Sequence, residues 1–238
     1  MSITKFTPRI PERTLTLISI VITTLSAQQP TPAERLRVPS LYDLAKQAKS
    51  EGRTSIELPP PVETPLICDG LDDYVDDSLI VTGTIRSSQA FPTGSYNNNV
   101  TTLYKLRLTG IVGGNRPLAP LRSTIPTELL PLLPGELLVA VSGGRLTIDG
   151  VEIISDSALS RQLIVGNSYL LFLDTRGIGT VVTAIRGGPL GAYEMRGDSI
   201  RALSKEANPV AIDIESRFHN SLLEVSRRIR ALPINNKN

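Results

Sequence analysis

The stretch Thr101-Thr-Leu-Tyr-Lys-Leu-Arg-Leu-Thr-Gly-Ile-Val112 alternates between apolar and polar residues over most of its length. Its even positions from 104 to 108 are Tyr, Leu and Leu, while its odd positions from 105 to 109 are Lys, Arg and Thr. Because successive side chains of a strand point to opposite faces, this spacing gives one apolar and one polar face. The stretch therefore predicts one wall of an antiparallel sheet or barrel.

Short apolar or alternating segments bounded by turn residues recur on both sides of this stretch. They predict strands at 79–85, 137–141, 145–148, 151–154, 169–173, 180–186, 192–195 and 199–203. Asp149-Gly150 separates one pair and Gly197-Asp198 another, and Asp-Gly is typical of a two-residue hairpin, whose central residues both need positive φ. No segment of crossover-helix length lies among the strands, so we expect a mainly β domain, either an antiparallel barrel or a sandwich.

Helical periodicity is confined to the two sides of this β region. Apolar residues at 41, 44, 45 and 48 predict a short helix that Ser40 caps and Gly52 ends. A proline-rich segment, 58–65, follows it and predicts a stiff, extended strap. Between 213 and 232, apolar residues recur every three or four positions, which predicts one amphipathic helix stopped by Pro233. We expect this helix to pack against the barrel or against a second copy of the chain.

The N-terminal segment has the pattern of an export signal. Basic residues at 5, 9 and 13 precede an uncharged, mostly apolar stretch from Leu15 to Ala27. That stretch is shorter than the roughly 20 residues that cross a bilayer as a helix. We expect cleavage after Ala27, although Leu25 is larger than the residue usually found at its position; an uncleaved anchor and a buried strand are the alternatives.

These patterns divide the chain into four segments: a signal peptide (1–27), a helix with the proline-rich strap (28–65), a β-barrel domain (66–205) and a C-terminal amphipathic helix with a tail (206–238). The sole cysteine, Cys68, excludes an intramolecular disulfide. A small secreted animal domain usually has several. We therefore expect a bacterial exported protein, periplasmic or extracellular, with no stable membrane span after cleavage.

Composition argues against two classes of partner. The chain has 25 basic and 23 acidic residues, and residues 1–27 hold three of the bases and one of the acids, which leaves 22 of each. A neutral mature chain lacks the positive surface of a nucleic-acid-binding protein. There is no tryptophan, with six tyrosines and four phenylalanines, so few rings are present for the stacking that carbohydrate and single-strand clefts use.

The order of these segments resembles a known family. Asp76-Asp-Ser-Leu-Ile-Val-Thr-Gly-Thr-Ile85 is similar to the opening pattern S-D-L-V-V-x-G-x-V of an uncharacterised family of bacterial exported proteins. The likeness continues through 102–108, Glu128-Leu-Leu-Pro, 143–150 and 169–173, and covers roughly residues 38–205. It implies an OB-like β-barrel domain, similar in form to netrin-type inhibitory modules. The chain lacks the cysteines of those modules, and the family has no assigned activity.

Two clusters have residue types that can bind ions. Five aspartates, at 69, 72, 73, 76 and 77, could supply oxygen ligands, but their spacing fits no calcium loop and favours a solvated helical turn. Three glycine pairs lie beside Arg116, Arg145 and Arg186. Backbone amides and guanidinium groups together can hold an anion, although turn geometry alone explains the glycines.

Other candidate residues have simpler interpretations. Cys68 is expected to be a buried small hydrophobe, and His219 to pair with Glu215 on a helix surface. In Ile125-Pro-Thr-Glu-Leu-Leu-Pro-Leu-Leu-Pro-Gly135, prolines flank four leucines: Leu129, Leu130, Leu132 and Leu133. These leucines either plug an open end of the barrel or form an apolar surface for a partner.

No pattern predicts a catalytic residue, a metal site or a cofactor. We therefore expect an exported, non-catalytic β-barrel module that acts as a cell-envelope binding or structural protein. Its expected partner is a cell-envelope protein, or a second copy through the C-terminal helix, and not a nucleic acid. The alternative is a hydrolase or small-ligand-binding enzyme that uses clustered carboxylates.

Overall fold

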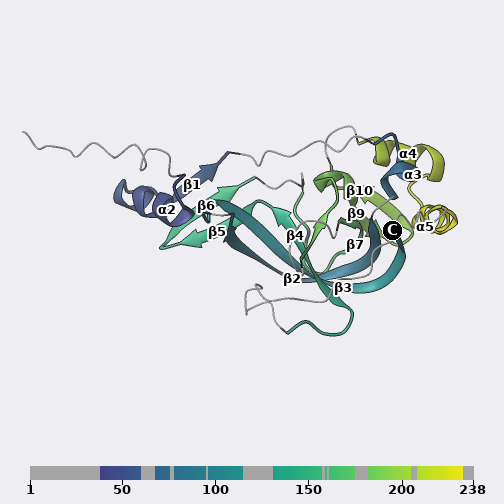
Figure 1. Cartoon of the computed structure of the whole chain (residues 1–238), viewed down its shortest axis with the longest axis horizontal. Helices are drawn as coiled ribbons and strands as arrows, with labels where there is room; N and C mark the ends of the chain where they lie inside the picture. The colour runs from purple at the N-terminus through teal and green to yellow at the C-terminus, as the bar shows by residue number, and fades with distance from the viewer. Residues whose placement is uncertain are drawn as a thin grey trace, which may run out of the picture. The chain divides into compact units, whose positions relative to one another are not determined.

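The computed structural model describes residues 38–59, 68–75, 78–94, 96–114, 131–156, 159, 161–174, 182–204 and 208–232. The described part is mainly β (Figure 1). Its strands are β1 (Ser55–Leu58), β2 (Leu79–Thr93), β3 (Asn99–Gly114), β4 (Glu136–Ser142), β5 (Gly144–Ile148), β6 (Val151–Ser155), β7 (Ser168–Asp174), β8 (Val182–Ile185), β9 (Ala192–Arg196) and β10 (Ser199–Ala202). Its helices are α2 (Leu41–Ser50), α3 (Leu71–Val75), the 3₁₀ turn η2 (Gly188–Gly191), α4 (Pro209–Phe218) and α5 (Leu222–Ala231).

Five strands close into a ring. β2, β3 and β4 pair as an antiparallel meander, β8 pairs in parallel with β4, and β7 pairs antiparallel with both β8 and β2. β9 and β10 extend the same sheet from the other half of β7. The mainly β class and the barrel-like arrangement expected from the sequence are thus confirmed, although the ring is not wholly antiparallel, because β8 pairs in parallel with β4.

Apolar side chains fill the inside of the ring. Alternate residues of its strands, among them Val81, Leu106, Val139 and Leu171, belong to one buried cluster. The intervening residues face outward; the outer face of β4, for example, presents Leu138, which packs with Leu103 in a separate cluster. This is the two-sided alternation that the stretch 101–112 predicts.

Three helices cover part of the outer face of the ring. Ile80, Leu170 and Phe172 point outward and pack with residues of α3, α4 and α5 in a second buried cluster. Strand β2 is therefore buried on both faces from Leu79 to Gly83, which is why its sequence reads as a continuous apolar run. Close packing of α5 on β3 requires Gly113, where a Cβ atom would lie 2.6 Å from Ile229 Cγ2.

A smaller sheet, in the order β1-β6-β5, packs with α2 on the far ends of β2 and β3. Ala90 and Val100, from those far ends, share a buried cluster with residues of α2 and the small sheet. Figure 1 shows β2 and β3 running from the ring to this second group of elements. The capping box at Ser40, predicted in part by the sequence, starts α2, and Asp149-Gly150 forms the β5–β6 hairpin with φ of 51° and 83°.

Three sequence-based expectations need correction. The single helix predicted from 213 to 232 is wrong: His219 and Asn220 adopt left-handed conformations, with φ of 50° and 59°, and divide it into α4 and α5. The strand predicted at 79–85 extends to Thr93. Strand β1 was not predicted, because its parallel pairing with β6 joins segments about a hundred residues apart.

Candidate functional site

A hollow lies where the ends of the two sheets meet. It has a volume of about 450 Å³ and is lined by the ends of β1, β2, β3, β4 and β6. We call it the junction hollow; its polar lining comes from Thr93, Asn98, Asn99, Thr101, Ser142 and Ser155, and its apolar lining from Leu58, Pro59 and Val100.

Two glycines position the walls of the junction hollow. The chain leaves β4 after Ser142 and enters β5 through Gly143 and Gly144, with φ of 92° and 135°. The N–H of Gly143 donates to Val100 O at 2.8 Å, and its carbonyl accepts from Thr102 Oγ1 at 2.7 Å. A Cβ atom at Gly144 would lie 2.1 Å from Thr102 Oγ1. Glycine at this point therefore allows the turn from the ring to the small sheet.

The polar lining of the junction hollow has no charged side chain among its described residues. Thr93 and Thr101 share a hydrogen bond of 2.7 Å between their hydroxyl oxygens. The side chains of Asn98, Asn99 and Ser142 make no hydrogen bond to another described residue. These amide and hydroxyl groups can both donate and accept, so they suit an uncharged ligand with many hydrogen-bonding groups.

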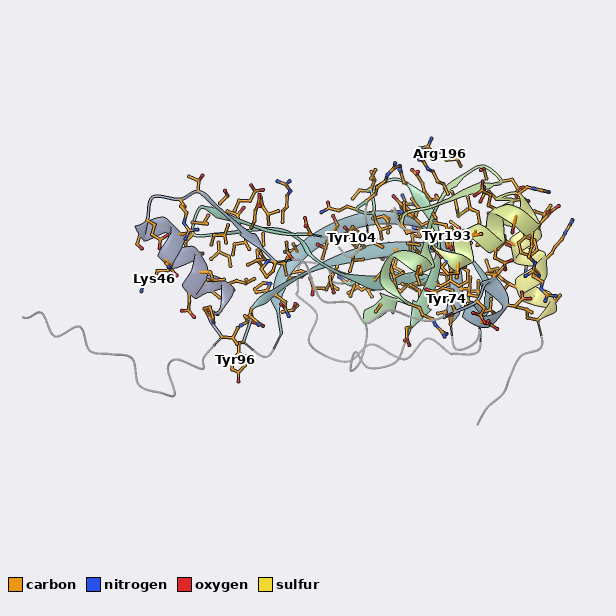
Figure 2. The ribbon with its side chains drawn as sticks, turned by 90° about the horizontal axis from the view of Figure 1, so that it is seen from above. Lys46, Tyr74, Tyr96, Tyr104, Tyr193 and Arg196 are labelled. Atoms are coloured by element: carbon orange, nitrogen blue, oxygen red, sulfur yellow. The ribbon has the colours of Figure 1, made fainter. Side chains whose placement is uncertain are left out.

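Two exposed tyrosines flank the contact between α2 and the β2–β3 turn, which leads into the lining of the junction hollow. The turn that links β2 to β3 is fixed to α2 by a hydrogen bond of 2.8 Å from Leu41 N–H to Asn97 O. Tyr42 and Tyr96 each adjoin one partner of that bond in sequence, and they are 52% and 58% exposed. Figure 2 shows Tyr96 pointing away from the ribbon near α2. The other four tyrosines of the chain are buried, so both exposed tyrosines belong to this corner.

Comparisons with known proteins found no match to a protein-family model, to a curated protein or to a solved structure. The junction hollow must therefore be interpreted from its own chemistry.

The aspartate cluster lies among the helices on the outside of the ring. Asp72, in α3, accepts hydrogen bonds from Arg228 Nε at 3.0 Å and Nη2 at 2.5 Å, and Arg217 Nη2 lies 3.4 Å from it. The hydrogen bonds from Arg228 hold the pKa of Asp72 below its usual value. Asp69 and Asp73 are exposed, while residues 76 and 77 lie outside the described residues. The predicted helical turn corresponds to α3.

The three candidate anion-binding arginines have different surroundings. Arg116 lies outside the described residues. Arg145 Nη1 contacts Glu152 Oε1 at 3.1 Å on the exposed face of the β5–β6 hairpin. Arg186 stacks over the ring of Tyr74, with 5.4 Å to the ring centroid, and donates to Ser78 Oγ at 3.1 Å. Arg145 and Arg186 each contact groups of the protein itself, and neither lines the junction hollow.

The predicted leucine surface is described only in part. Leu129 and Leu130 lie outside the described residues. Leu132 packs against Leu103 and Leu138 on the outer face of the ring, and Leu133 is 54% exposed. Leu132 therefore lies against the outer wall of the ring, and Leu133 is too exposed to fill its interior.

The remaining candidates do not form a reactive group in the described part of the chain. His219 is exposed and ends α4, and its N–H donates to Glu215 O at 3.1 Å. Cys68 is half-buried beside the cluster under the outer helices, and burial raises the pKa of its thiol, which lowers its reactivity. No group of three or more His, Cys, Asp or Glu side chains that could hold a metal occurs among the described residues. No described helix has the length and apolar character needed to span a membrane.

The junction hollow as a whole cannot be predicted from the sequence. Its lining comes from positions between 58 and 155 on five strands, so no local spacing shows it. One local signal is present: the run Tyr96-Asn-Asn-Asn99, which is typical of a turn, places a tyrosine beside three amide side chains and so suits a hydrogen-bonding corner.

Proposed function

We propose that this chain is an exported, non-catalytic binding module of the cell envelope, whose junction hollow holds an uncharged, hydroxyl-rich ligand such as a stretch of glycan. The observation that carries the proposal is the lining of the hollow, whose described residues combine amide and hydroxyl groups and include no charged side chain. Export is supported by the basic residues and apolar stretch that precede Ala27.

An OB-like barrel is the fold we infer for this module. It is supported by the order of the ring: a three-strand meander, β2-β3-β4, whose last member pairs in parallel with β8, while β7 closes the ring. That order suits a five-stranded Greek-key barrel of the OB type. The likeness of 76–85 to the exported family points to the same fold.

The exposed tyrosines support a carbohydrate ligand in particular. A sugar ring presents C–H groups on its faces and hydroxyl groups at its edges, so it can lie against an aromatic side chain while its hydroxyls reach amides. Tyr42 and Tyr96 adjoin the hydrogen-bonded corner from which Asn98 and Asn99 line the hollow. The low number of aromatic residues argues against an extended cleft with many stacking rings, but the two exposed tyrosines lie at one corner, where they can contact a sugar ring.

The alternative of a carboxylate hydrolase has less support. A general acid needs a carboxyl group whose pKa is raised, whereas the pKa of Asp72 is lowered by its hydrogen bonds to Arg228. Asp72 therefore has a structural role, in which it joins the outer helices, and it is not a candidate general acid. We place the ligand in the junction hollow instead.

Calorimetric titration of the purified chain with uncharged oligosaccharides, such as N-acetylglucosamine oligomers and glucans, tests the proposal. We expect Asn98→Ala combined with Ser142→Ala to weaken binding by about tenfold, since each net hydrogen bond contributes about 0.5–1.5 kcal/mol. Ser88→Ala, at an exposed position of β2 outside the lining, is the matched control and should bind normally. The proposal fails if no uncharged oligosaccharide binds, or if the double variant binds as tightly as the control.

A further inference from the structure

Strand β10 ends its sheet, and its pairing with β9 leaves one set of backbone groups facing away. The two-residue turn Gly197-Asp198 makes Arg196 and Ser199 a hydrogen-bonded pair. Hydrogen-bonded pairs alternate along an antiparallel ladder, and the N–H of Leu203 accordingly donates to Ala192 O at 3.0 Å. The N–H and C=O groups of Ile200 and Ala202 must therefore point to the outer edge.

Part of that edge is already paired with a short segment of the chain. The N–H of Ile200 donates to Asn220 O at 2.9 Å, and the N–H of Leu222 donates to Asp198 O at 2.7 Å. This segment pairs antiparallel through Ser199 and Ser221. The segment begins at Asn220, whose φ of 59° turns the chain out of α4 and onto this edge. The chain's own segment 220–222 thus pairs with the outer edge of β10, but only beside Asp198, Ser199 and Ile200.

The second half of the edge faces a groove. Ile200 C=O and both backbone groups of Ala202 have no hydrogen-bond partner among the described residues. Beside them lies a hollow of about 380 Å³ that is lined by Ser199–Ala202 together with Ala211, Glu215 and Asn220. Ala211 and Glu215 belong to α4, so one wall is a strand edge and the other is a helix. We call this hollow the edge groove.

The chemistry of the edge groove selects an extended peptide. Unpaired N–H and C=O groups along a strand edge are satisfied by another strand, and side-chain contacts then determine which peptide binds. The small Ala211 leaves room on the helix wall, and Ile212 beside it is 56% exposed. Glu215 on the helix and Arg201 on the strand are both exposed, so each favours an opposite charge on the peptide.

We propose that the edge groove binds an extended segment of a partner protein, which adds to β10 as a strand and places a basic side chain near Glu215. A second copy of this chain fits less well, because it would bring its own α4 and its own segment 220–222 to the same edge. The site is separate from the junction hollow, which is lined by other strands, so either proposal can fail without the other.

Selection of short random peptides on the full purified chain, followed by fluorescence anisotropy with the enriched peptides, tests the inference. Ala202→Pro removes the outward N–H, and an edge strand tolerates proline where its N–H faces away from the sheet. We expect this variant to weaken binding at least about tenfold. Ala202→Val, which keeps the N–H, is the matched control and should bind within about twofold of the unmodified chain. Methylating alternate backbone nitrogens of an enriched peptide should weaken binding in one register only, which tests the ladder without altering the protein.

Charge reversal provides the second readout. Glu215→Lys should exchange the preference of enriched peptides from a basic to an acidic residue at one position. The inference is overturned if no peptide is enriched, or if enriched peptides bind Ala202→Pro as well as Ala202→Val. It is also overturned if light scattering shows a dimer of the chain that Ala202→Pro dissociates, because the occupant would then be a second copy.

Discussion

A single residue, Asp72, connects the three helices on the outside of the ring. Its carboxylate, in α3, contacts Arg217 of α4 and Arg228 of α5. We expect Asp72→Asn to lower the free energy of unfolding at pH 6 by less than a core truncation would, because all three side chains are partly exposed. Asp69→Asn, an exposed neighbour outside these ion pairs, is the matched control and should have almost no effect.

The effect of Asp72→Asn should depend on pH. A carboxyl group whose pKa is lowered by folding stabilises the native state above its unfolded pKa, which is near 3.9 for aspartate, and that stabilisation is lost as the pH falls through the lowered value. The stabilities of the two proteins in urea unfolding should therefore differ at pH 6, begin to approach each other below about pH 4, and become equal once the pH is below the lowered pKa of Asp72. A difference that stayed constant down to pH 2 would show that the carboxylate charge is not involved.

Gly83 has a similarly local role in the wall of the ring. A Cβ atom there would lie 2.6 Å from Arg107 O and 2.8 Å from Leu106 Cδ1 on the paired strand. We expect Gly83→Ala to destabilise the chain by about 1–3 kcal/mol, because the backbone of β3 must move. Gly110→Ala is the control, since its Cβ would meet only Thr82 Oγ1, at 3.1 Å, and should change stability by less than about 1 kcal/mol. Equal losses in urea unfolding would contradict the close-approach explanation.

Among the secondary-structure elements, those with local causes were predictable and those with distant causes were not. The alternation at 101–112 predicted β3, and Asp149-Gly150 predicted the β5–β6 hairpin. Helix periodicity continues through 219 and 220, so it could not reveal the break between α4 and α5. The break has a tertiary contribution from Asp198, on a distant hairpin, and a local one from Ser221, whose side chain accepts from Glu224 N–H at the start of α5.

Asp198 caps the second of these helices from outside. Its Oδ1 accepts from Leu223 N–H at 2.9 Å, and its Oδ2 accepts from Ser221 Oγ at 2.7 Å. We expect Asp198→Ala to lower stability by about 1 kcal/mol, as loss of an N-terminal cap usually does. Asp156→Ala, at an exposed position without such contacts among the described residues, is the control. In Asp198→Ala, hydrogen exchange should become faster first in the backbone amides of α5. Faster exchange in β7 alone would argue against a capping role for Asp198.

The molecule as a whole joins two hydrophobic clusters through one long hairpin. The inner core of the ring and the cluster under α2 share the strands β2 and β3. Both parallel pairings, β1–β6 and β4–β8, connect segments far apart in sequence. No local pattern specifies which distant strands meet, so the strands of the junction hollow were predictable in part and the hollow itself was not.

The junction hollow is lined both by strands of the ring and by strands of the small sheet. Ligand binding in the hollow should therefore be lost when the cluster under α2 is disturbed, before the ring itself unfolds. Leu41, the first residue of α2, is fully buried against the small sheet, and its N–H donates to Asn97 O in the β2–β3 turn. Leu41→Ala should cost about 2–4 kcal/mol of local stability, and hydrogen exchange should quicken in β5 and β6 while β7 stays protected. Ligand binding at the hollow should then weaken at least about tenfold, whereas Leu223→Ala, at a position 51% exposed on α5, should leave it unchanged. If exchange instead quickened equally in β7, the two clusters would unfold as one cooperative unit, and the hollow would depend on the whole fold and not on the docking of α2.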